Sequence, residues 1–367
     1  MPVAAWRQPY PDSRRDRLMT FLVPSLLTIA LAAAGGGVAT LLGLPAGWIM
    51  GGALVVSVAA MAGVPVAMPN RLRDVVFVLI GMSMGASVAP DSLSLLPSWP
   101  ASLAGLVLEL VLIIGLTGWM LQRRFGLDRG TAYLSSFPGH LSFVMAIASA
   151  GVGDARQIAI IQVIRILMLT VAVPIGAMFL PVAEFTPAAD FGTLGVLELL
   201  MLAAGCVVVG LVFVRLKVPA GLVLGAMAAS TAAKLAGLYT AAIPEPLAII
   251  TFVLTGALIG SRFAGITRRE FMAAAKGGVI ATLMTLVIVT AVAWGVSLVV
   301  SIPFAQIWIG LAPGALEGMG ALGIALGYDT AFIAAHHVVR LMLLTFAIPL
   351  VVALIQRRET ATIGRDD

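Results

Sequence analysis

Long apolar segments separated by short polar connections run through the chain from about residue 18 to residue 355. Of the 367 residues, 60% are hydrophobic and only 11% are charged, whereas about a quarter of an average soluble domain is charged. Most of the segments have the roughly 20 residues that a helix needs to cross a bilayer. The sequence therefore predicts an all-α polytopic membrane protein, and it excludes most soluble enzyme folds.

The apolar segments form two sets of six that match in order. Pro45-Ala46-Gly47 returns 174 residues later as Pro219-Ala220-Gly221. From Phe77 onward the offset is 175 residues, and these pairs hold it: Gly81 and Gly256, Gly85 and Gly260, Pro138-Gly139 and Pro313-Gly314, Asp154 and Asp329, Arg165 and Arg340. One register held across so many glycine, proline and charged positions indicates a duplication.

The duplication defines the domain organisation. We predict a tail at 1–17, a first membrane repeat at 18–182, a linker at 183–191, a second repeat at 192–356 and a tail at 357–367. Arginines followed by an apolar run make the N-terminus resemble a signal peptide. Because the segment Leu18–Leu42 has a counterpart in the middle of the chain, we expect it to be a retained helix.

The basic residues decide between two topologies. If all twelve segments span, the halves are parallel, with 13 Lys and Arg inside and 7 outside. If the fifth segments, Thr131–Ala150 and Phe304–Gly327, enter and leave on one side, the halves are inverted and 19 of 22 lie inside. The positive-inside rule favours the second topology, with about ten spanning helices, two re-entrant hairpins and cytoplasmic termini. Twelve spanning helices remain the alternative.

Both fifth segments contain Pro-Gly near the middle, as Pro138-Gly139-His140 and as Pro313-Gly314. Proline removes a helical hydrogen bond, so we expect a broken helix at each place. The N-terminus of a broken helix can hold an anion and free carbonyls can hold a cation. Broken helices between inverted repeats are typical of secondary transporters. The alternative is a kink with only a packing role.

Two helices share an aspartate, a polar residue and an arginine at equal spacing: Asp154, Gln162 and Arg165, then Asp329, His337 and Arg340. Each arginine lies about 16 Å along its helix, near the middle of a ~30 Å core. An arginine at that depth needs protein, water or a counter-ion. We expect either a polar face toward a solute or arginines that hold the carbonyls of the broken hairpins. The aspartates are predicted helix N-caps.

Three acidic residues lie inside predicted segments: Glu109, Glu198 and Glu317. Glu109 and Glu317 are the candidates for proton coupling, whereas Glu198 is close to a segment end. Glu109 follows Leu108 in an apolar run, and its repeat counterpart is Met284. Glu317 follows the second Pro-Gly motif. Buried carboxylates can carry protons, and they can equally serve as counter-ions to arginine.

Metal and cofactor chemistry has little support in the sequence. His140, His336 and His337 are the only histidines and Cys206 is the only cysteine, without a metal-ligand spacing. Nucleotide-binding and hydrolase motifs are absent in the contexts that would give them meaning. We therefore expect no metal, no cofactor, no catalytic residue and no nucleic-acid partner. The predicted solute-binding residues are Pro138, Gly139, His140, Gln162, Arg165, Pro313, Gly314, Glu317, His337 and Arg340.

The paired Pro-Gly motifs, the Pro-Ala-Gly sequences and the Asp-x10-Arg helices make the chain resemble the AbrB family of bacterial integral membrane proteins, over about residues 18–356. Members carry a duplicated AbrB domain and commonly have a second Gly after Pro-Gly. His140 and Ala315 stand at that position here, and Glu317-Gly318-Met319 only approximates the family's acidic residue followed by Met. The resemblance implies two labels, ammonia monooxygenase and regulation of gene expression.

We expect a secondary transporter or exporter that moves a small polar or anionic solute across the bacterial inner membrane, driven by an ion gradient. Its partners would be the bilayer, the solute and a coupling ion, and a homodimer is left open. A membrane regulator of gene expression is the alternative, although the short tails leave little surface for signalling. A monooxygenase-type enzyme ranks third, because three histidines and one cysteine do not assemble a copper site.

Overall fold

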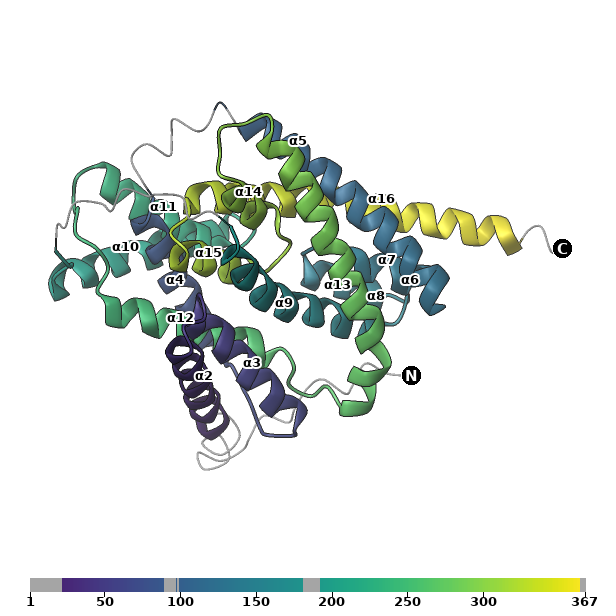
Figure 1. Cartoon of the computed structure of the whole chain (residues 1–367), viewed down its shortest axis with the longest axis horizontal. Helices are drawn as coiled ribbons and strands as arrows, with labels where there is room; N and C mark the ends of the chain where they lie inside the picture. Colours follow the sequence, from purple (N-terminus) through teal and green to yellow (C-terminus); the bar gives the residue numbers. More distant parts are fainter. Residues whose placement is uncertain (1–21, 89–96, 98, 181–191, 364–367) are drawn as a thin grey trace.

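A computed structural model describes residues 22–88, 97, 99–180 and 192–363. These residues form an all-α bundle with no β-strand in the described ranges, apart from one isolated bridge between Thr193 and Ala242 (Figure 1). The predicted tail at 1–17, the predicted linker at 183–191 and the end of the C-terminal tail lie outside the described residues. The predicted all-α polytopic fold is confirmed.

The helices of the first half come in an order that the second half repeats. The first half contains α2 (Val23–Leu41), α3 (Gly47–Met61), α4 (Asn70–Ala86), α5 (Trp99–Leu112), the π-helical turn η4 (Ile113–Thr117), α6 (Gly118–Phe125), α7 (Arg129–Ser136), α8 (Leu141–Ser149) and α9 (Ala155–Ala177). The second half contains α10 (Val196–Arg215), α11 (Gly221–Leu235), α12 (Glu245–Ser261), α13 (Arg268–Ser297), α14 (Phe304–Leu311), α15 (Leu316–Ala325) and α16 (Thr330–Ile363).

Six of the described helices are long and apolar enough to cross a membrane: Val23–Leu41, Trp99–Phe125, Ala155–Ala177, Val196–Arg215, Arg268–Ser297 and Thr330–Ile355. Four further helices, α3, α4, α11 and α12, have 15 to 17 residues. At a rise of 1.5 Å per residue they are about 22–26 Å long, slightly short of the ~30 Å core.

The backbone repeats as closely as the sequence does. Ala46 and Ala220, which precede α3 and α11, both have a left-handed conformation with φ 51°. Each stands between a proline and a glycine in the duplicated Pro-Ala-Gly sequence. The duplicated motif therefore encodes the same tight entry into the second helix of each half.

Glycines let helices of opposite halves touch along their backbones. A Cβ atom at Gly81 of α4 would lie 2.2 Å from the carbonyl oxygen of Val223, and one at Gly85 would lie 2.5 Å from that of Met227. The residue numbers of the contacting pairs increase together along the two helices, so α4 and α11 run in parallel. This is the small-residue packing that brings helices together in membranes.

The equivalent contact on the other side joins α12 to α3. A Cβ atom at Gly256 would lie 2.7 Å from the Ile49 carbonyl oxygen, and one at Gly260 would lie 2.8 Å from that of Ala53. Consecutive spans joined by a short connection, such as α3 and α4, are antiparallel. Since α4 is parallel to α11, α3 and its counterpart α11 are antiparallel, and the two repeats are inverted.

Each pair of short helices is a hairpin whose two ends meet. Thr131 at the start of α7 accepts a hydrogen bond from the amide of Asp154, which precedes α9, at 2.7 Å. In the second half the Asp329 amide donates to Gln306 of α14 at 3.5 Å. A kinked full span would separate these ends by about 30 Å. Each fifth segment therefore enters and leaves on one side, as the charge distribution predicts.

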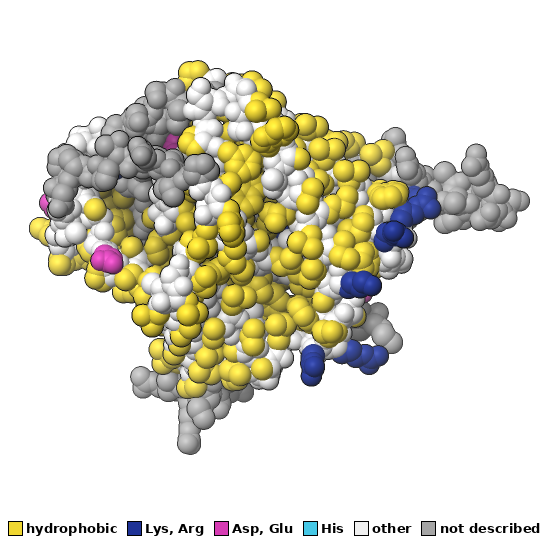
Figure 2. All heavy atoms as spheres, viewed as in Figure 1, with side chains coloured by type: hydrophobic (Ala, Val, Ile, Leu, Met, Phe, Trp, Pro, Cys, Tyr) yellow, Lys and Arg dark blue, Asp and Glu magenta, His cyan; other side chains and the backbone are white. Residues whose placement is uncertain are grey.

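The surface has the character of a membrane protein. Figure 2 shows a face that is largely hydrophobic, with the basic side chains in view gathered along one edge. Exposed apolar side chains such as Leu200, Val287 and Phe346 belong to the long helices. A hydrophobic surface of this extent needs lipid around it.

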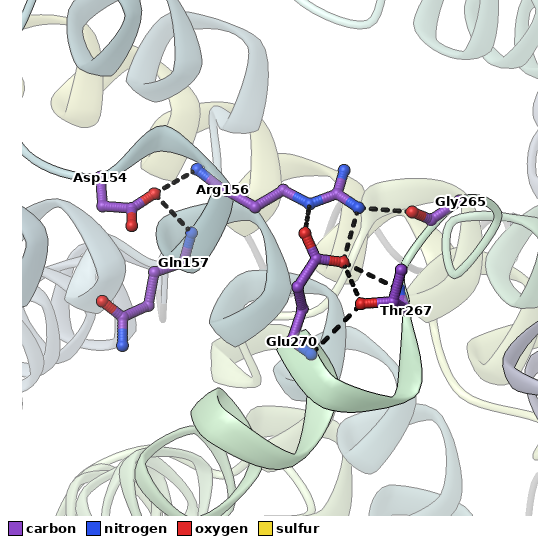
Figure 3. Close-up of polar contacts among 6 residues, drawn as sticks. All are labelled: Asp154, Arg156, Gln157, Gly265, Thr267 and Glu270. Atoms are coloured by element: carbon purple, nitrogen blue, oxygen red, sulfur yellow. Dashed lines mark hydrogen bonds and ion pairs between the residues drawn. The ribbon is translucent and has the colours of Figure 1, made fainter.

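One ion pair joins the two halves where α9 and α13 begin. Arg156 donates to both carboxylate oxygens of Glu270, at 2.8 and 2.9 Å (Figure 3). Glu270 also accepts from Thr267, which caps α13, and Arg156 contacts the Gly265 carbonyl. Asp154 caps α9 by accepting from the amides of Arg156 and Gln157. This network fixes the start of both helices on one side of the bundle.

Candidate functional site

The two Pro-Gly motifs break their helices in the middle of the hairpins. Helix α7 ends at Ser136 and α8 begins at Leu141, with Gly139 at φ 131° and His140 at φ 57° between them. Helix α14 ends at Leu311 and α15 begins at Leu316. Neither α8 nor α15 has a side chain that caps its N-terminus. Both helices therefore present amide groups of their first turns without side-chain caps.

A cavity of about 260 Å³ lies where the two breaks face each other. It is lined by all ten residues that the sequence predicts to bind a solute: Pro138, Gly139, His140, Gln162, Arg165, Pro313, Gly314, Glu317, His337 and Arg340. Residues far apart in the chain, from both hairpins and from α9 and α16, thus share one space. The positive ends of the α8 and α15 dipoles border it.

Arg340 of α16 holds the end of α14 in place. Its guanidinium donates to the carbonyl oxygens of Gly310, Leu311 and Ala312, at 3.2, 2.6 and 3.1 Å. These carbonyls come at the end of a helix, where they have no intrahelical donor. Arg340 is 2% exposed, so it satisfies carbonyls that water does not reach. Of the two roles expected for the arginines, Arg340 therefore has the second: it holds the carbonyls of a broken hairpin.

Arg165 of α9 has the same position in the first repeat but different surroundings. It is 5% exposed, and among the described residues it donates no hydrogen bond, with its buried Nε atom unpaired. Gln162 instead donates to the α7 carbonyl of Leu134 at 3.1 Å. The first hairpin is therefore held by an amide, and the Arg165 charge is left facing the cavity.

The cavity holds one ion pair. Glu317 at the start of α15 forms a salt bridge with Arg262, which follows α12. Glu317 is the one acidic residue of the lining, against the arginines 165, 262 and 340. The charges therefore sum to an excess of positive charge before any solute enters, in a space where water screens little.

The remaining polar residues of the lining have fewer partners. His337 contacts the Ile333 carbonyl through Nδ1 at 2.9 Å, and its buried Nε2 atom has no partner in the described part of the chain. His140 lies 3.2 Å from the Thr345 hydroxyl through Nε2. Both rings can turn a nitrogen toward a solute as donor or acceptor, depending on the tautomer.

The other predicted residues lie outside this cavity. Glu109 on α5 is fully buried, and neither of its carboxylate oxygens has a hydrogen-bond partner among the described residues. It lies within electrostatic range of Arg340. Asp329 accepts from the amide of Ala331 at 2.9 Å at the start of α16, as Asp154 does at α9. The described residues contain no group of three or more His, Cys, Asp or Glu that could hold a metal ion.

Seven lining residues are missing from the predicted set, and only one of them is charged: Leu141, Ile166, Ala220, Arg262, Ala315, Leu316 and Leu341. Arg262 was counted only as a basic residue on the cytoplasmic side, and Ala220 only as part of a repeat motif. A signal for Arg262 existed, because its counterpart at the 175-residue offset is Ser87. A charge present in one repeat alone, directly after the glycine-rich third segment, marks a departure from symmetry.

Comparisons with known proteins find relatives along most of the chain. The model of the family described as "Transition state regulatory protein AbrB" matches residues 48–356. A Bacillus subtilis (strain 168) protein named "Uncharacterized protein YhjN" is 26% identical over 361 residues, covering 89% of this chain and 92% of its own length. An Escherichia coli (strain K12) protein named "Putative regulator AbrB" is 25% identical over 309 residues, covering 81% and 86%.

Proposed function

This chain belongs to the AbrB family, and from the geometry of its cavity we propose that it is a secondary transporter of a small anion across the bacterial inner membrane. The observation that carries the proposal is the buried Arg165, which faces the cavity without a partner among the described residues. A charge that is so deeply buried is costly unless a counter-ion joins it. A bound anion would supply that counter-ion.

The neighbours of Arg165 support an anion over a cation. The N-terminal turns of α8 and α15 border the same space, and helix N-termini attract negative charge. Free amides would orient an oxyanion, and Arg165 would neutralise it by two parallel hydrogen bonds. Inverted repeats with broken helices at the midplane are the arrangement in which transporters bind their solutes.

The volume of the cavity limits the size of the solute. It measures about 260 Å³, whereas pockets for drug-sized ligands occupy about 300–1,000 Å³. A small carboxylate or an inorganic oxyanion fits this space, and a nucleotide or a peptide exceeds it. We therefore propose a solute of a few heavy atoms with one or two negative charges.

A proton gradient is the proposed source of energy, and two carboxyl groups are candidates to carry the proton. Glu317 shares the cavity with the proposed anion binding site, so its charge and that of the solute interact directly. Glu109 lies away from the lining but within electrostatic range of Arg340. Intramembrane carboxyl groups commonly serve as proton relays in transporters.

The test is uptake by the purified protein in proteoliposomes. Labelled phosphate, sulfate, acetate and succinate would be offered with and without a pH gradient, in parallel for the wild type, Arg165→Met and the control Arg124→Gln, an exposed arginine on α6. We expect uptake of at least one anion that Arg165→Met abolishes and Arg124→Gln preserves. Uptake that is equal in all three would refute the role of Arg165.

A regulatory role is the second candidate, because the Escherichia coli relative carries the name of a regulator. In that case the cavity would sense an anion and not release it on the other side. Anion binding without flux in the same proteoliposomes would favour the sensor. We further propose that the protein is not a monooxygenase, which metal analysis of the purified protein tests: copper bound at one equivalent would contradict this.

A further inference from the structure

A second hollow, which shares no lining residue with the anion cavity, opens on the lipid-facing surface of the bundle. It measures about 570 Å³ and lies between the continuous helix α5-η4-α6 and helix α16. Figure 1 shows α16 running past α5 and α6. Apolar side chains such as Val111 and Leu350, which are 64% and 63% exposed, form most of its walls. We call it the α6/α16 groove.

One end of the groove is basic. Arg123 at the end of α6 and Arg129 at the start of α7 both line it. Neither arginine forms a salt bridge or a side-chain hydrogen bond within the described ranges. Two free guanidinium groups at the end of an apolar groove create a local binding site for a phosphate group.

Amphipathic side chains stand between the apolar and basic ends. Trp119 is 54% exposed and lies one helical turn before Arg123, and Tyr133 and Gln122 complete the lining there. Tryptophan and tyrosine are enriched where the hydrocarbon meets the headgroups. The groove thus changes from apolar through amphipathic to cationic, in the order in which a phospholipid changes from tail to headgroup.

The length of the groove agrees with one leaflet. Val107 and Arg123 mark its ends on the α5-η4-α6 helix and are 16 residues apart, which corresponds to about 24 Å. Half of a bilayer with its headgroups is about 20–22 Å thick. A single phospholipid can therefore place its acyl chains against Val107 and its phosphate against Arg123.

The π-helical turn η4 lines the groove at its middle. Ile114 and Gly115 of this turn belong to the lining, and a Cβ atom at Gly115 would meet nothing within 4 Å. A π-turn inside an α-helix is rare and often marks a functional site. The groove between α5 and α13, about 430 Å³ and lined by apolar residues and glycine alone, has no such basic end.

We propose that the α6/α16 groove is a binding site for an anionic phospholipid, with the phosphate held by Arg123 and Arg129. Anionic lipids favour basic pockets between membrane helices on the cytoplasmic side. The positive-inside rule predicts that side for both arginines. The proposal is independent of the transport function, because no residue of the groove lines the anion cavity.

The experiment is native mass spectrometry of the full chain in a neutral detergent, with phosphatidylglycerol or phosphatidylcholine of equal acyl chains added. The test variant is Arg123→Gln with Arg129→Gln. The matched control is Arg124→Gln with Arg215→Gln, two exposed arginines that do not line the groove. A third variant, Gly115→Leu, fills the groove where there is free space.

We expect the wild type to bind phosphatidylglycerol more tightly than phosphatidylcholine. Each arginine should contribute about a five-fold difference in affinity between the two lipids. The test variant should lose this preference, the control should keep it, and Gly115→Leu should weaken both lipids. Equal binding of the two lipids by the wild type, or an equal loss in test variant and control, would overturn the proposal. The proposal would also be overturned if the wild type were a dimer that Gly115→Leu dissociates, because the groove would then be a contact between two copies. Since Arg123 is exposed and Arg129 half-buried, the test variant should fold. It therefore tests the proposal even if Gly115→Leu does not fold.

Discussion

Arg165 and Arg340 occupy equivalent positions in the two repeats, yet only Arg340 is hydrogen-bonded to a hairpin. Arg340 donates to three carbonyls at the end of α14. Arg165 faces the cavity with its Nε unpaired, while Gln162 holds the Leu134 carbonyl of the first hairpin. The duplication therefore produced one arginine that holds a hairpin and one whose charge faces the cavity.

Replacement of each arginine by methionine should separate these two roles. Arg340→Met removes the guanidinium that donates to three buried carbonyls, and we expect a loss of about 2–4 kcal/mol in the free energy of unfolding. Arg165→Met removes a buried charge that has no partner, so the stability should stay equal or rise. Thermal unfolding of both variants in the same detergent measures the difference.

Anion binding should depend on Arg165, although the stability of the protein should not. An anion that raises the unfolding temperature of the wild type should leave that of Arg165→Met unchanged. Arg165→Lys, which keeps the charge without the planar fork, should bind more weakly than the wild type and more tightly than the methionine variant. If Arg165→Met unfolds as early as Arg340→Met, the assignment of different roles fails.

Glu317 should oppose anion binding. It is the one acidic side chain of the lining and pairs with Arg262, for which an entering anion would compete. Glu317→Gln removes a negative charge a few ångströms from the solute. The repulsion between this charge and the anion is about 1 kcal/mol or more at the dielectric constant of a protein. We therefore expect the variant to bind the anion at least about five-fold more tightly. Titration calorimetry with an anion identified in the uptake screen measures it.

A matched control exists for this substitution. Glu198→Gln also removes one carboxylate, but Glu198 caps the start of α10 through the Gly195 amide and does not line the cavity. Its affinity should equal that of the wild type. If Glu317→Gln binds the anion more weakly, Glu317 contacts the solute directly, as a protonated donor would. Flux that no longer depends on the pH gradient in Glu317→Gln would identify it as the proton carrier.

The glycines between opposite halves should tolerate no side chain. Gly81→Ala would bring a Cβ atom 2.2 Å from the Val223 carbonyl oxygen, which is backbone and cannot turn away. Separating α4 from α11 to relieve this contact should cost about 1–3 kcal/mol. Gly205→Ala of α10 is the control, because nothing lies within 4 Å of its Cβ position, and it should be neutral or slightly stabilising. Thermal unfolding would contradict the packing if both variants behaved alike.

Much of this arrangement could be predicted from the sequence, because the repeat and the Pro-Gly motifs that break the helices can be recognised in it. Pro138-Gly139 and Pro313-Gly314 mark the breaks, and the 175-residue offset pairs Arg165 with Arg340. Inverted repeats bring paired positions to one central axis, which is why ten predicted residues line one cavity. Helix boundaries were less accurate: α4 begins at Asn70, although the predicted apolar segment begins at Val75, because polar Arg71 and Arg73 extend the helix toward water.

Apart from the charge of Arg262, whose counterpart in the other repeat is Ser87, the contacts that break the symmetry could not be predicted. The difference between Arg165 and Arg340 depends on which side chain reaches the hairpin carbonyls, and both arginines have similar neighbours in sequence. The Arg262–Glu317 pair joins residues 55 positions apart in a single repeat. The α6/α16 groove depends on how two helices of different halves lie against each other. Such contacts depend on packing in three dimensions, which helical periodicity does not reveal.

Cysteine labelling can test the inverted topology directly. Cys206 is the single cysteine and is buried, so Cys206→Ser provides a background for cysteines at four exposed sites: Leu42, Arg124, Leu238 and Ala264. Inverted repeats predict Leu42 and Leu238 on the outside and Arg124 and Ala264 on the inside. Twelve spans would instead place Leu42 with Ala264 outside and Arg124 with Leu238 inside. A membrane-impermeant maleimide applied to intact cells should therefore label positions 42 and 238 only, and labelling of position 264 in place of 238 would contradict the inverted arrangement.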